Sequence, residues 1–401
     1  MDRASAVRVT GPLGPHAGGF RDELVGLGYS PRTAQTHLLL MNRLSGWLQA
    51  TGVEPGALTA QRIEQFLAAN HTQRQRFPKS SRGAEPLVGF LRRSALVPEA
   101  PVAVLTATEA LADRFRLYLT GERGLGAGTI TNYVHAARLF LGHVGRVEAD
   151  DLARLGAATV QTFILCESRH RSVASTKNLV SGLRSLLRFF HVAGVTEASL
   201  AGAVPAVSGW TGTWLPRAID ASAVERLLAS CDRGSDQGCR DYAVLVVLSR
   251  LGMRIGEVAA LELDDVEWRS GDLVVRGKAN RLERLPLPVD VGQALADYVQ
   301  RGRPPSEHRA LFLRMLAPRR GLTRGGLIVI VKSACRRAGI EPVAAHRLRH
   351  TVASELLRAG AGLPEIGQLL RHRSIASTAI YASVDTDALR GLARPWPGAQ
   401  S

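Results

Sequence analysis

Apolar side chains recur every three or four residues over long stretches of the sequence, and this spacing constrains the fold most. After Ser30-Pro31, a pair typical of a helix start, the spacing runs from Leu38 to Leu48. It returns from Ile130 to Leu141. A spacing of this kind gathers apolar side chains on one face of a helix. The sequence therefore predicts a mainly α-helical chain built from amphipathic helices.

Two helical stretches in the first half of the chain resemble one another. Aligning residues 30–48 with 126–144, and 58–69 with 155–166, gives nearly the same offset both times. A duplicated helical unit would produce this pattern. We expect an extra N-terminal helical unit over residues 1–100 and a second helical domain over residues 101–200.

Each helical stretch is followed by a basic segment. The net charge of the 401-residue chain is +16, which favours a polyanionic partner such as nucleic acid. A solvated loop is the alternative for the first segment, residues 71–93, and an Arg-rich proteome can raise the net charge without any function. The candidate DNA-contacting residues in the two segments are Arg74, Arg76, Lys79, Arg82, Arg169, Arg171, Lys177 and Arg184.

The composition changes after residue 196, where small residues, glycine and proline replace charged ones. We interpret residues 201–216 as a linker and residues 217–401 as a further domain with a C-terminal tail. Within it, residues 272–276 and 282–287 alternate as strands around a Gly277–Asn280 turn, which predicts a β-hairpin with Lys278 at its tip. Helices are expected at 220–230, 241–251, 291–301 and 322–338.

Several classes of protein are disfavoured. The four cysteines show no zinc-ligand spacing, so they are expected to be free thiols in a reducing compartment. No apolar run approaches the roughly 20 residues that a bilayer requires, and no secretory signal is expected. The sequence predicts a cytoplasmic protein with no membrane partner.

Chemically suggestive residues follow one another in a fixed order in the last domain. They are Gly252-x-Arg254-x-x-Glu257, then Gly277-Lys278, then His346-x-x-Arg349-His350, then His372, and finally Tyr381 nine residues later. Each piece alone is a weak signal. In this order, with the expected hairpin between them, they resemble the tyrosine recombinases, or phage-type integrases. The chain departs from the family pattern at Ala279, Arg281 and Arg371, where the family more often has Gly, Lys and Gly.

The resemblance implies a fold of SAM-like helical DNA-binding domains followed by a mixed α+β catalytic domain. It implies double-stranded DNA as substrate, other protomers of the same chain in a four-protomer synapse, and related recombinases as further partners. No cofactor or metal is expected, because two arginines would supply the positive charge that Mg²⁺ supplies in other phosphoryl-transfer enzymes. The extra N-terminal unit and the absence of a housekeeping signature favour a mobile element, while integration, excision, resolution and transposition all stay open as the process.

The roles of the site residues follow from the resemblance and from phosphoryl-transfer chemistry. Tyr381 would be the nucleophile, which forms a 3′-phosphotyrosyl bond that conserves the energy of the phosphodiester. The planar guanidinium groups of Arg254 and Arg349 would clamp the phosphate oxygens. The remaining catalytic candidates are Lys278 as general acid, His346 for proton transfer at the tyrosine oxygen and His372 as a phosphate hydrogen-bond donor, with Glu257 as an accessory residue that orients the arginines.

We expect no catalytic role for three neighbouring residues. We take His350 as structural, and Arg371 and Arg373 as phosphate contacts or solvated charges. Two alternative functions stay open. One is a relaxing enzyme like a type IB topoisomerase, and the other is a catalytically silent or partner-dependent DNA-binding accessory protein.

Overall fold

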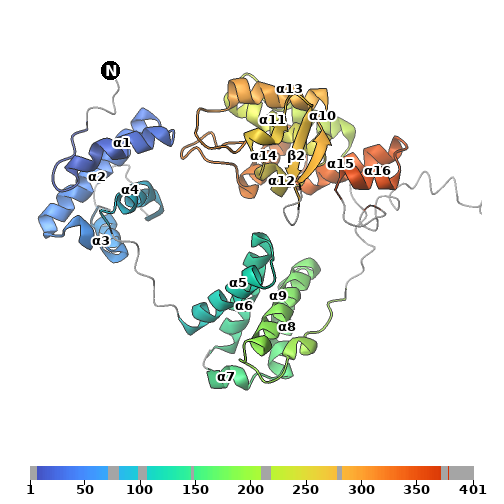
Figure 1. The fold of residues 1–401 in the computed structure, drawn as a ribbon, viewed down its shortest axis with the longest axis horizontal. Helices are drawn as coiled ribbons and strands as arrows, with labels where there is room; N and C mark the ends of the chain where they lie inside the picture. The colour runs from blue at the N-terminus through green and yellow to red at the C-terminus, as the bar shows by residue number, and fades with distance from the viewer. Residues whose placement is uncertain are drawn as a thin grey trace, which may run out of the picture. The chain divides into compact units, whose positions relative to one another are not determined.

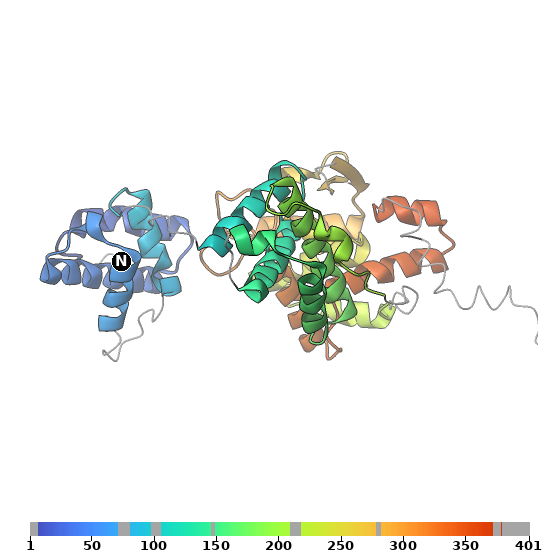
Figure 2. The same ribbon diagram turned by 90° about the horizontal axis from the view of Figure 1, so that it is seen from below.

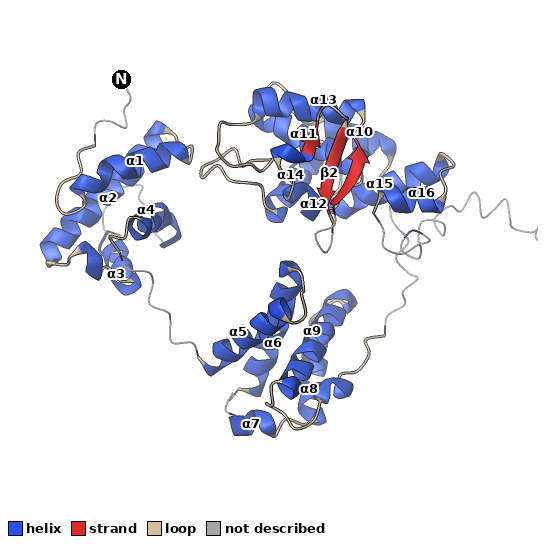
Figure 3. Ribbon diagram, in the orientation of Figure 1, coloured by secondary structure: helices blue, strands red, loops and turns tan. Residues whose placement is uncertain are grey.

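A computed structural model describes residues 7–70, 81–97, 106–145, 149–208, 218–277, 282–371 and 378. The chain folds into two compact units, of which the first contains Met1–Ala100 with Trp214–Ser401 and the second contains Pro101–Thr213. Helices predominate in the described ranges, and one three-stranded sheet accompanies them (Figures 1 and 3). The predicted mainly α fold with a small sheet is therefore confirmed. Within those ranges, every helix is too short or too polar to span a bilayer.

Four helices enclose a core of their own in the N-terminal part of the first unit (Figure 2). They are α1 (Ala17–Gly26), α2 (Pro31–Thr51), α3 (Ala60–Asn70) and α4 (Ser81–Arg93). Helix α2 begins as the sequence predicts, because Pro31 occupies the first turn and the Ser30 hydroxyl accepts a hydrogen bond from the Thr33 backbone N–H at 3.3 Å. The apolar face that follows is buried, with Leu38, Met41 and Leu44 no more than 1% exposed.

Two helices of this part were not predicted. Helix α1 lies ahead of the predicted helix that starts after Ser30, and it buries Phe20 and Leu24 completely. Helix α4 lies in the basic stretch, so the alternative of a solvated loop is wrong for residues 81–93. Its apolar residues at 84, 87, 88 and 91 are buried at helical spacing, but Pro86 within the segment and the basic residues on either side obscured that spacing in the sequence.

The second unit is a helical domain with its own core. It contains α5 (Ala107–Gly121), α6 (Ala127–Val144), α7 (Ala149–Ala153), α8 (Ala157–Ser168) and α9 (Val173–Val192). Helices α6 and α9 approach closely at Gly182, where an added Cβ would lie 2.9 Å from the Ala136 Cβ. A glycine is therefore required at residue 182 for these helices to pack at this distance.

The C-terminal part of the first unit combines seven helices and the sheet in its described ranges. The helices are α10 (Ala221–Ala229), α11 (Asp236–Arg250), α12 (Ile255–Ala259), α13 (Val289–Asp297), α14 (Arg324–Arg337), α15 (Ala345–Arg358) and α16 (Leu363–Leu369). A π-helical turn, Tyr298–Gly302, extends α13. The strands β1 (Val266–Glu267), β2 (Asp272–Arg276) and β3 (Leu282–Pro286) form an antiparallel sheet in the order β1-β2-β3.

The predicted hairpin is present in this sheet. Arg276 pairs with Leu282 at the end of the β2–β3 ladder. Residues 278–281, which include Lys278, lie outside the described ranges. Helix α11 begins earlier than predicted, because the Ser235 side chain caps it by accepting a hydrogen bond from the Gly238 N–H at 3.1 Å.

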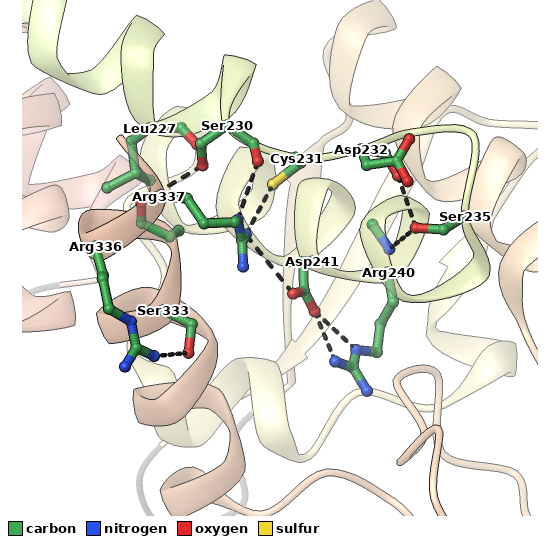
Figure 4. Close-up of polar contacts among 12 residues, drawn as sticks. Leu227, Ser230, Cys231, Asp232, Ser235, Arg240, Asp241, Ser333, Arg336 and Arg337 are labelled. Atoms are coloured by element: carbon green, nitrogen blue, oxygen red, sulfur yellow. Dashed lines mark hydrogen bonds and ion pairs between the residues drawn. The ribbon is translucent and has the colours of Figure 1, made fainter. Parts of the chain in front are cut away.

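Helix α11 is the most buried helix of this part, and a polar cluster fixes its first turns (Figure 4). Asp241 is 2% exposed and pairs with Arg240 at 2.7 Å. Arg337 of α14 approaches the other Asp241 oxygen at 3.8 Å and donates to the Ser230 carbonyl at 3.0 Å. The Cys231 thiol, buried beside Arg337, has a raised pKa because burial disfavours the thiolate. The cluster joins α11, α14 and the end of α10, and it is structural.

Candidate active site

Arg254 lies directly after α11, in a turn that only glycine can make. Gly252 has a φ of +55°, and a Cβ there would lie 2.7 Å from the Leu370 Cδ2 atom. The turn ends at Arg254, the N-cap residue of α12. The Arg254 side chain is 44% exposed, so its guanidinium can reach an external anion.

Arg349 projects from α15 and is buried to 1% exposure. Its Nη1 atom donates to the Gly252 carbonyl at 2.7 Å, and Nη2 donates to the Leu370 carbonyl. A buried guanidinium of this kind is held in one orientation by its planar fork of donors. Arg349 therefore fixes the glycine turn that precedes Arg254.

The two arginines, which are distant in sequence, share one short segment of chain. Arg349 donates to the carbonyl of Leu370, and Arg254 Nη2 donates to the carbonyl of the next residue, Arg371, at 3.2 Å. Consecutive carbonyls thus orient both guanidinium groups. The structure brings together the two residues that we predicted to clamp the phosphate.

Glu257, which we predicted to orient the two arginines, contacts Arg254 and Arg371, and its orienting role stays a prediction. It is 7% exposed, and its two oxygens accept from the Arg254 Nη1 at 2.7 Å and from the Arg254 backbone N–H at 2.8 Å. Burial alone would raise its pKa. The Arg371 guanidinium and the hydrogen bonds from Arg254 outweigh burial and lower the pKa of Glu257 below its usual value. Glu257 is therefore an anion in the folded protein at neutral pH.

His346 and His350 lie one turn apart on α15, with ring centroids 4.3 Å apart in an edge-to-face arrangement. Burial, followed by the charges of Arg349 and Arg254, lowers the pKa of His346. Burial and then His346, Arg349 and Arg347 lower the pKa of His350 to about 4. Both imidazoles are therefore neutral at pH 7, and a neutral imidazole can accept a proton.

Arg371 corrects one of the predictions. We expected a phosphate contact or a solvated charge, but its side chain is only 3% exposed and its Nη2 atom donates to Glu257 Oε2 at 2.7 Å. Its φ is +56°, in the left-handed region that favours glycine. This backbone conformation accounts for the glycine that the family usually has at this position. The departure from the family pattern was the only signal in the sequence that pointed to Arg371.

The other predicted residues divide into two groups. Lys278, His372, Arg373, Tyr381, Arg74, Arg76 and Lys79 lie outside the described residues, as does the side chain of Arg82. In the second unit, Arg171 pairs with Glu167 at 2.6 Å, and Arg184 donates to the carbonyls of Val204 and Pro205 at 3.0 Å. Arg169 is exposed and Lys177 is half-buried. Contact of these residues with DNA stays a prediction.

Sequence comparisons identify two matching family models. One, described as "Phage integrase family", covers residues 217–387, and the other, described as "Phage integrase, N-terminal SAM-like domain", covers residues 112–194. The chain is 39% identical to a Sinorhizobium fredii protein named "Putative integrase/recombinase y4rA", with 97% of this chain and 95% of that protein aligned. It is 32% identical to the tyrosine recombinase XerD of Mycobacterium tuberculosis, over 70% of this chain and 94% of XerD.

A comparison of structures gives the same fold. The crystal structure of the XerH site-specific recombinase bound to a palindromic difH substrate matches with a TM-score of 0.56 and 20% identity. The match covers 71% of this chain and 84% of that chain. At this level of identity the likeness shows the fold.

Proposed function

The chain belongs to the tyrosine recombinase family and is a site-specific DNA recombinase, and we propose that it cuts DNA through a covalent bond between Tyr381 and a 3′-phosphate. The phenolic oxygen attacks phosphorus, and the bond from phosphorus to the 5′-oxygen breaks. The phenol loses its proton and the 5′-oxygen gains one, which leaves a free 5′-hydroxyl. Attack by the 5′-hydroxyl of the partner strand reverses these steps and joins the exchanged strands.

The observation that best supports this proposal is the pairing of Arg254 and Arg349 through the carbonyls of Leu370 and Arg371. In the transition state negative charge grows on the non-bridging phosphate oxygens. The exposed Arg254 guanidinium is already oriented when this charge develops, and the buried Arg349 holds the turn that places it. Preorganised donors of this kind each contribute about 3 kcal/mol to transition-state stabilisation.

The proposed proton transfers use neighbouring groups. A neutral His346 takes the phenol proton as Tyr381 attacks, and the lowered pKa of His346 supports that role. Lys278 gives a proton to the leaving 5′-oxygen, and His372 donates a hydrogen bond to the phosphate. Glu257 acts only through the arginines. No step of this scheme is routed through a metal or cofactor.

The assembly follows from strand exchange between two duplex sites. We propose that four protomers hold two sites in one synapse, with related recombinases able to replace some of them. The helical domain over residues 101–200 contacts DNA, and the extra unit over residues 1–100 extends that footprint or mediates assembly. Deleting residues 1–100 and measuring DNA protection tests the last point, since an unchanged footprint with unchanged recombination contradicts it.

We assign the reaction to a mobile genetic element, which could use it for integration, excision or transposition. The extra N-terminal unit distinguishes the chain from a minimal two-domain recombinase. A plasmid carrying the DNA that flanks the gene, together with the purified protein, tests this assignment by the products that form. Products joined at the ends of the element are expected, and resolution of plasmid dimers alone would contradict it.

A nicked suicide duplex tests the covalent intermediate. Cleavage next to the nick releases a short strand that cannot return, so the protein remains joined to DNA. We expect an adduct with the wild-type chain and none with Tyr381→Phe, detected as a band shift in a denaturing gel. An adduct that persists in Tyr381→Phe would assign the nucleophile to another residue.

The purified protein and these DNA substrates also distinguish the proposed function from the two alternatives. A topoisomerase-like enzyme relaxes supercoiled plasmid at dilutions where the protein is monomeric, whereas a recombinase needs two sites and several protomers. An accessory protein binds DNA but forms no adduct unless a related recombinase is added. An enzyme is favoured over an accessory protein by the intact set Arg254, Lys278, His346, Arg349, His372 and Tyr381.

A further inference from the structure

Arg371 is a buried cation to which the proposed chemistry gives no role. With Arg240 and Arg349, it is one of three arginines that are less than 10% exposed within the described ranges. Its Nη1 atom donates to the Leu369 carbonyl at 3.0 Å, and its Nη2 atom donates to Glu257 at 2.7 Å. A buried cation is tolerated only when it is paired and hydrogen-bonded, so these contacts account for its position.

Arg371 and Arg254 share the same carboxylate. Glu257 Oε1 accepts from the Arg254 side chain, and Glu257 Oε2 accepts from the Arg254 backbone and from Arg371. The Arg371 carbonyl in turn accepts from Arg254 Nη2. Arg254 and Arg371 therefore share one carboxylate, so the position of the exposed Arg254 guanidinium depends on where Arg371 holds Glu257.

Arg371 also faces strand β3. Its Nε atom lies 3.9 Å from Glu283 Oε2, an ion-pair distance. Both atoms are buried, and neither has a hydrogen-bond partner in the described part of the chain. Glu283 is the second residue of β3, the strand that follows the hairpin turn containing Lys278 in the sequence.

We propose that Arg371 is a positioning residue of the recombination site, which holds Arg254 through Glu257 and holds strand β3 through Glu283. One guanidinium thereby fixes three segments: the start of α12, the β2–β3 hairpin and the chain after α16. Each of these segments carries or adjoins a residue to which the proposed function gives a catalytic role, so the inference rests on that function.

The backbone at residue 371 supports an active role for the side chain. A φ of +56° is unfavourable for a residue with a Cβ and costs glycine almost nothing. A strained residue persists only where the surrounding contacts over-determine it. Here the contacts of the Arg371 side chain with Glu257, Glu283 and the Leu369 carbonyl hold the residue in this conformation.

Two substitutions at residue 371 and one matched control test the proposal in the full-length protein. Arg371→Met removes the charge, and Arg371→Gly removes it while relieving the backbone. Arg301→Met removes the same charge from an exposed arginine that pairs with Asp297 at 2.9 Å. The measurements are the rate constant for adduct formation at saturating DNA on the nicked duplex, and the dissociation constant for that duplex.

Both substitutions of Arg371 are expected to lower the rate constant on the order of 10–100-fold, because small displacements of positioned groups cost about that much. The dissociation constant for DNA should stay near the wild-type value, and Arg301→Met should change neither quantity. Arg371→Lys should restore part of the rate, since an ammonium can pair with Glu257 but has no planar fork to span both acids.

Two results would overturn the proposal. A wild-type rate for Arg371→Gly would show that residue 371 needs only its backbone conformation. A raised dissociation constant with an unchanged rate would make Arg371 a DNA contact instead.

The proposed function can fail separately from this inference. If the wild-type chain binds DNA but forms no adduct, the proposed nucleophilic role of Tyr381 is wrong. Thermal unfolding then tests whether Arg371 holds Glu283. Arg371→Met and Glu283→Gln should be non-additive when they are combined, because each removes the same contact. Additive shifts in the midpoint temperature would overturn the inference.

Discussion

Gly252→Ala is predicted to damage both the fold and the site, because the turn between α11 and α12 has no room for a side chain. The new Cβ would meet the Leu370 Cδ2 atom at 2.7 Å in a backbone with a φ of +55°. Gly339→Ala is the matched control. Gly339 has a φ of +63°, but a Cβ there has no neighbour within 4 Å.

The two substitutions differ in one physical quantity. A left-handed backbone costs an alanine about 1–2 kcal/mol, so the free energy of unfolding falls by this amount in both variants. Forcing a methyl group against a packed leucine lowers the free energy of unfolding by about 1–3 kcal/mol more, and this second cost applies only to Gly252→Ala. For a region of this size, 1 kcal/mol corresponds to roughly 2–4 °C in the unfolding midpoint. Gly252→Ala should therefore unfold at a temperature roughly 2–12 °C below that of Gly339→Ala.

Calorimetry of the full-length protein measures this difference, and the adduct assay measures its effect on the site. The Gly252 and Leu370 carbonyls both hold Arg349, so a shift at their contact should displace that guanidinium. Gly252→Ala should slow adduct formation, and Gly339→Ala should leave it near wild type. Equal midpoints for the two variants would refute the packing argument, because Leu370 would then have moved away without cost.

Three further predictions concern buried charge and pH. Asp241→Asn should destabilise the protein by about 3–5 kcal/mol, because it leaves Arg240 buried without its anion, whereas Asp264→Asn, in an exposed pair, should cost less than about 1 kcal/mol. The pKa of His350 is lowered to about 4 from the usual 6.5, so as the pH falls the unfolded chain takes up this proton before the folded chain does. The contribution of His350 to stability should therefore be constant above pH 6.5 and be lost towards pH 4, and His350→Gln should reduce the slope of stability against pH in that range. Arg349→Lys should slow adduct formation by roughly 100-fold, because a lysine cannot reproduce the bidentate geometry, and a rate within a factor of two of wild type would contradict that reasoning.

The helical fold could be read from the sequence where local signals agreed. At α2 the cap at Ser30, Pro31 and the apolar spacing all point to the same helix, and the structure confirms it. At α1 and α4 local signals conflicted, since glycines open α1 before its first buried residue and Pro86 lies inside α4. Burial in a shared core decided both cases, and a single sequence does not record which core a segment joins.

The candidate site was less accessible to sequence reasoning. Nothing in spacing or composition brings Arg254 near Arg349; the expectation came from the resemblance to a family. The burial of Arg371 was missed because an isolated arginine in a polar segment is usually solvated. Its partner Glu257 lies more than a hundred residues earlier, so only the folded chain reveals the pair.

The buried pair of Arg371 and Glu257 constrains the order in which these two positions could change during evolution. A chain with glycine at residue 371 could accept an arginine only after an acid was present at residue 257, since an unpaired buried guanidinium costs several kcal/mol. Once the arginine is in place, losing that acid becomes far more harmful than it was before. The two positions are therefore expected to have changed in a fixed order, and later substitutions at one are conditional on the other.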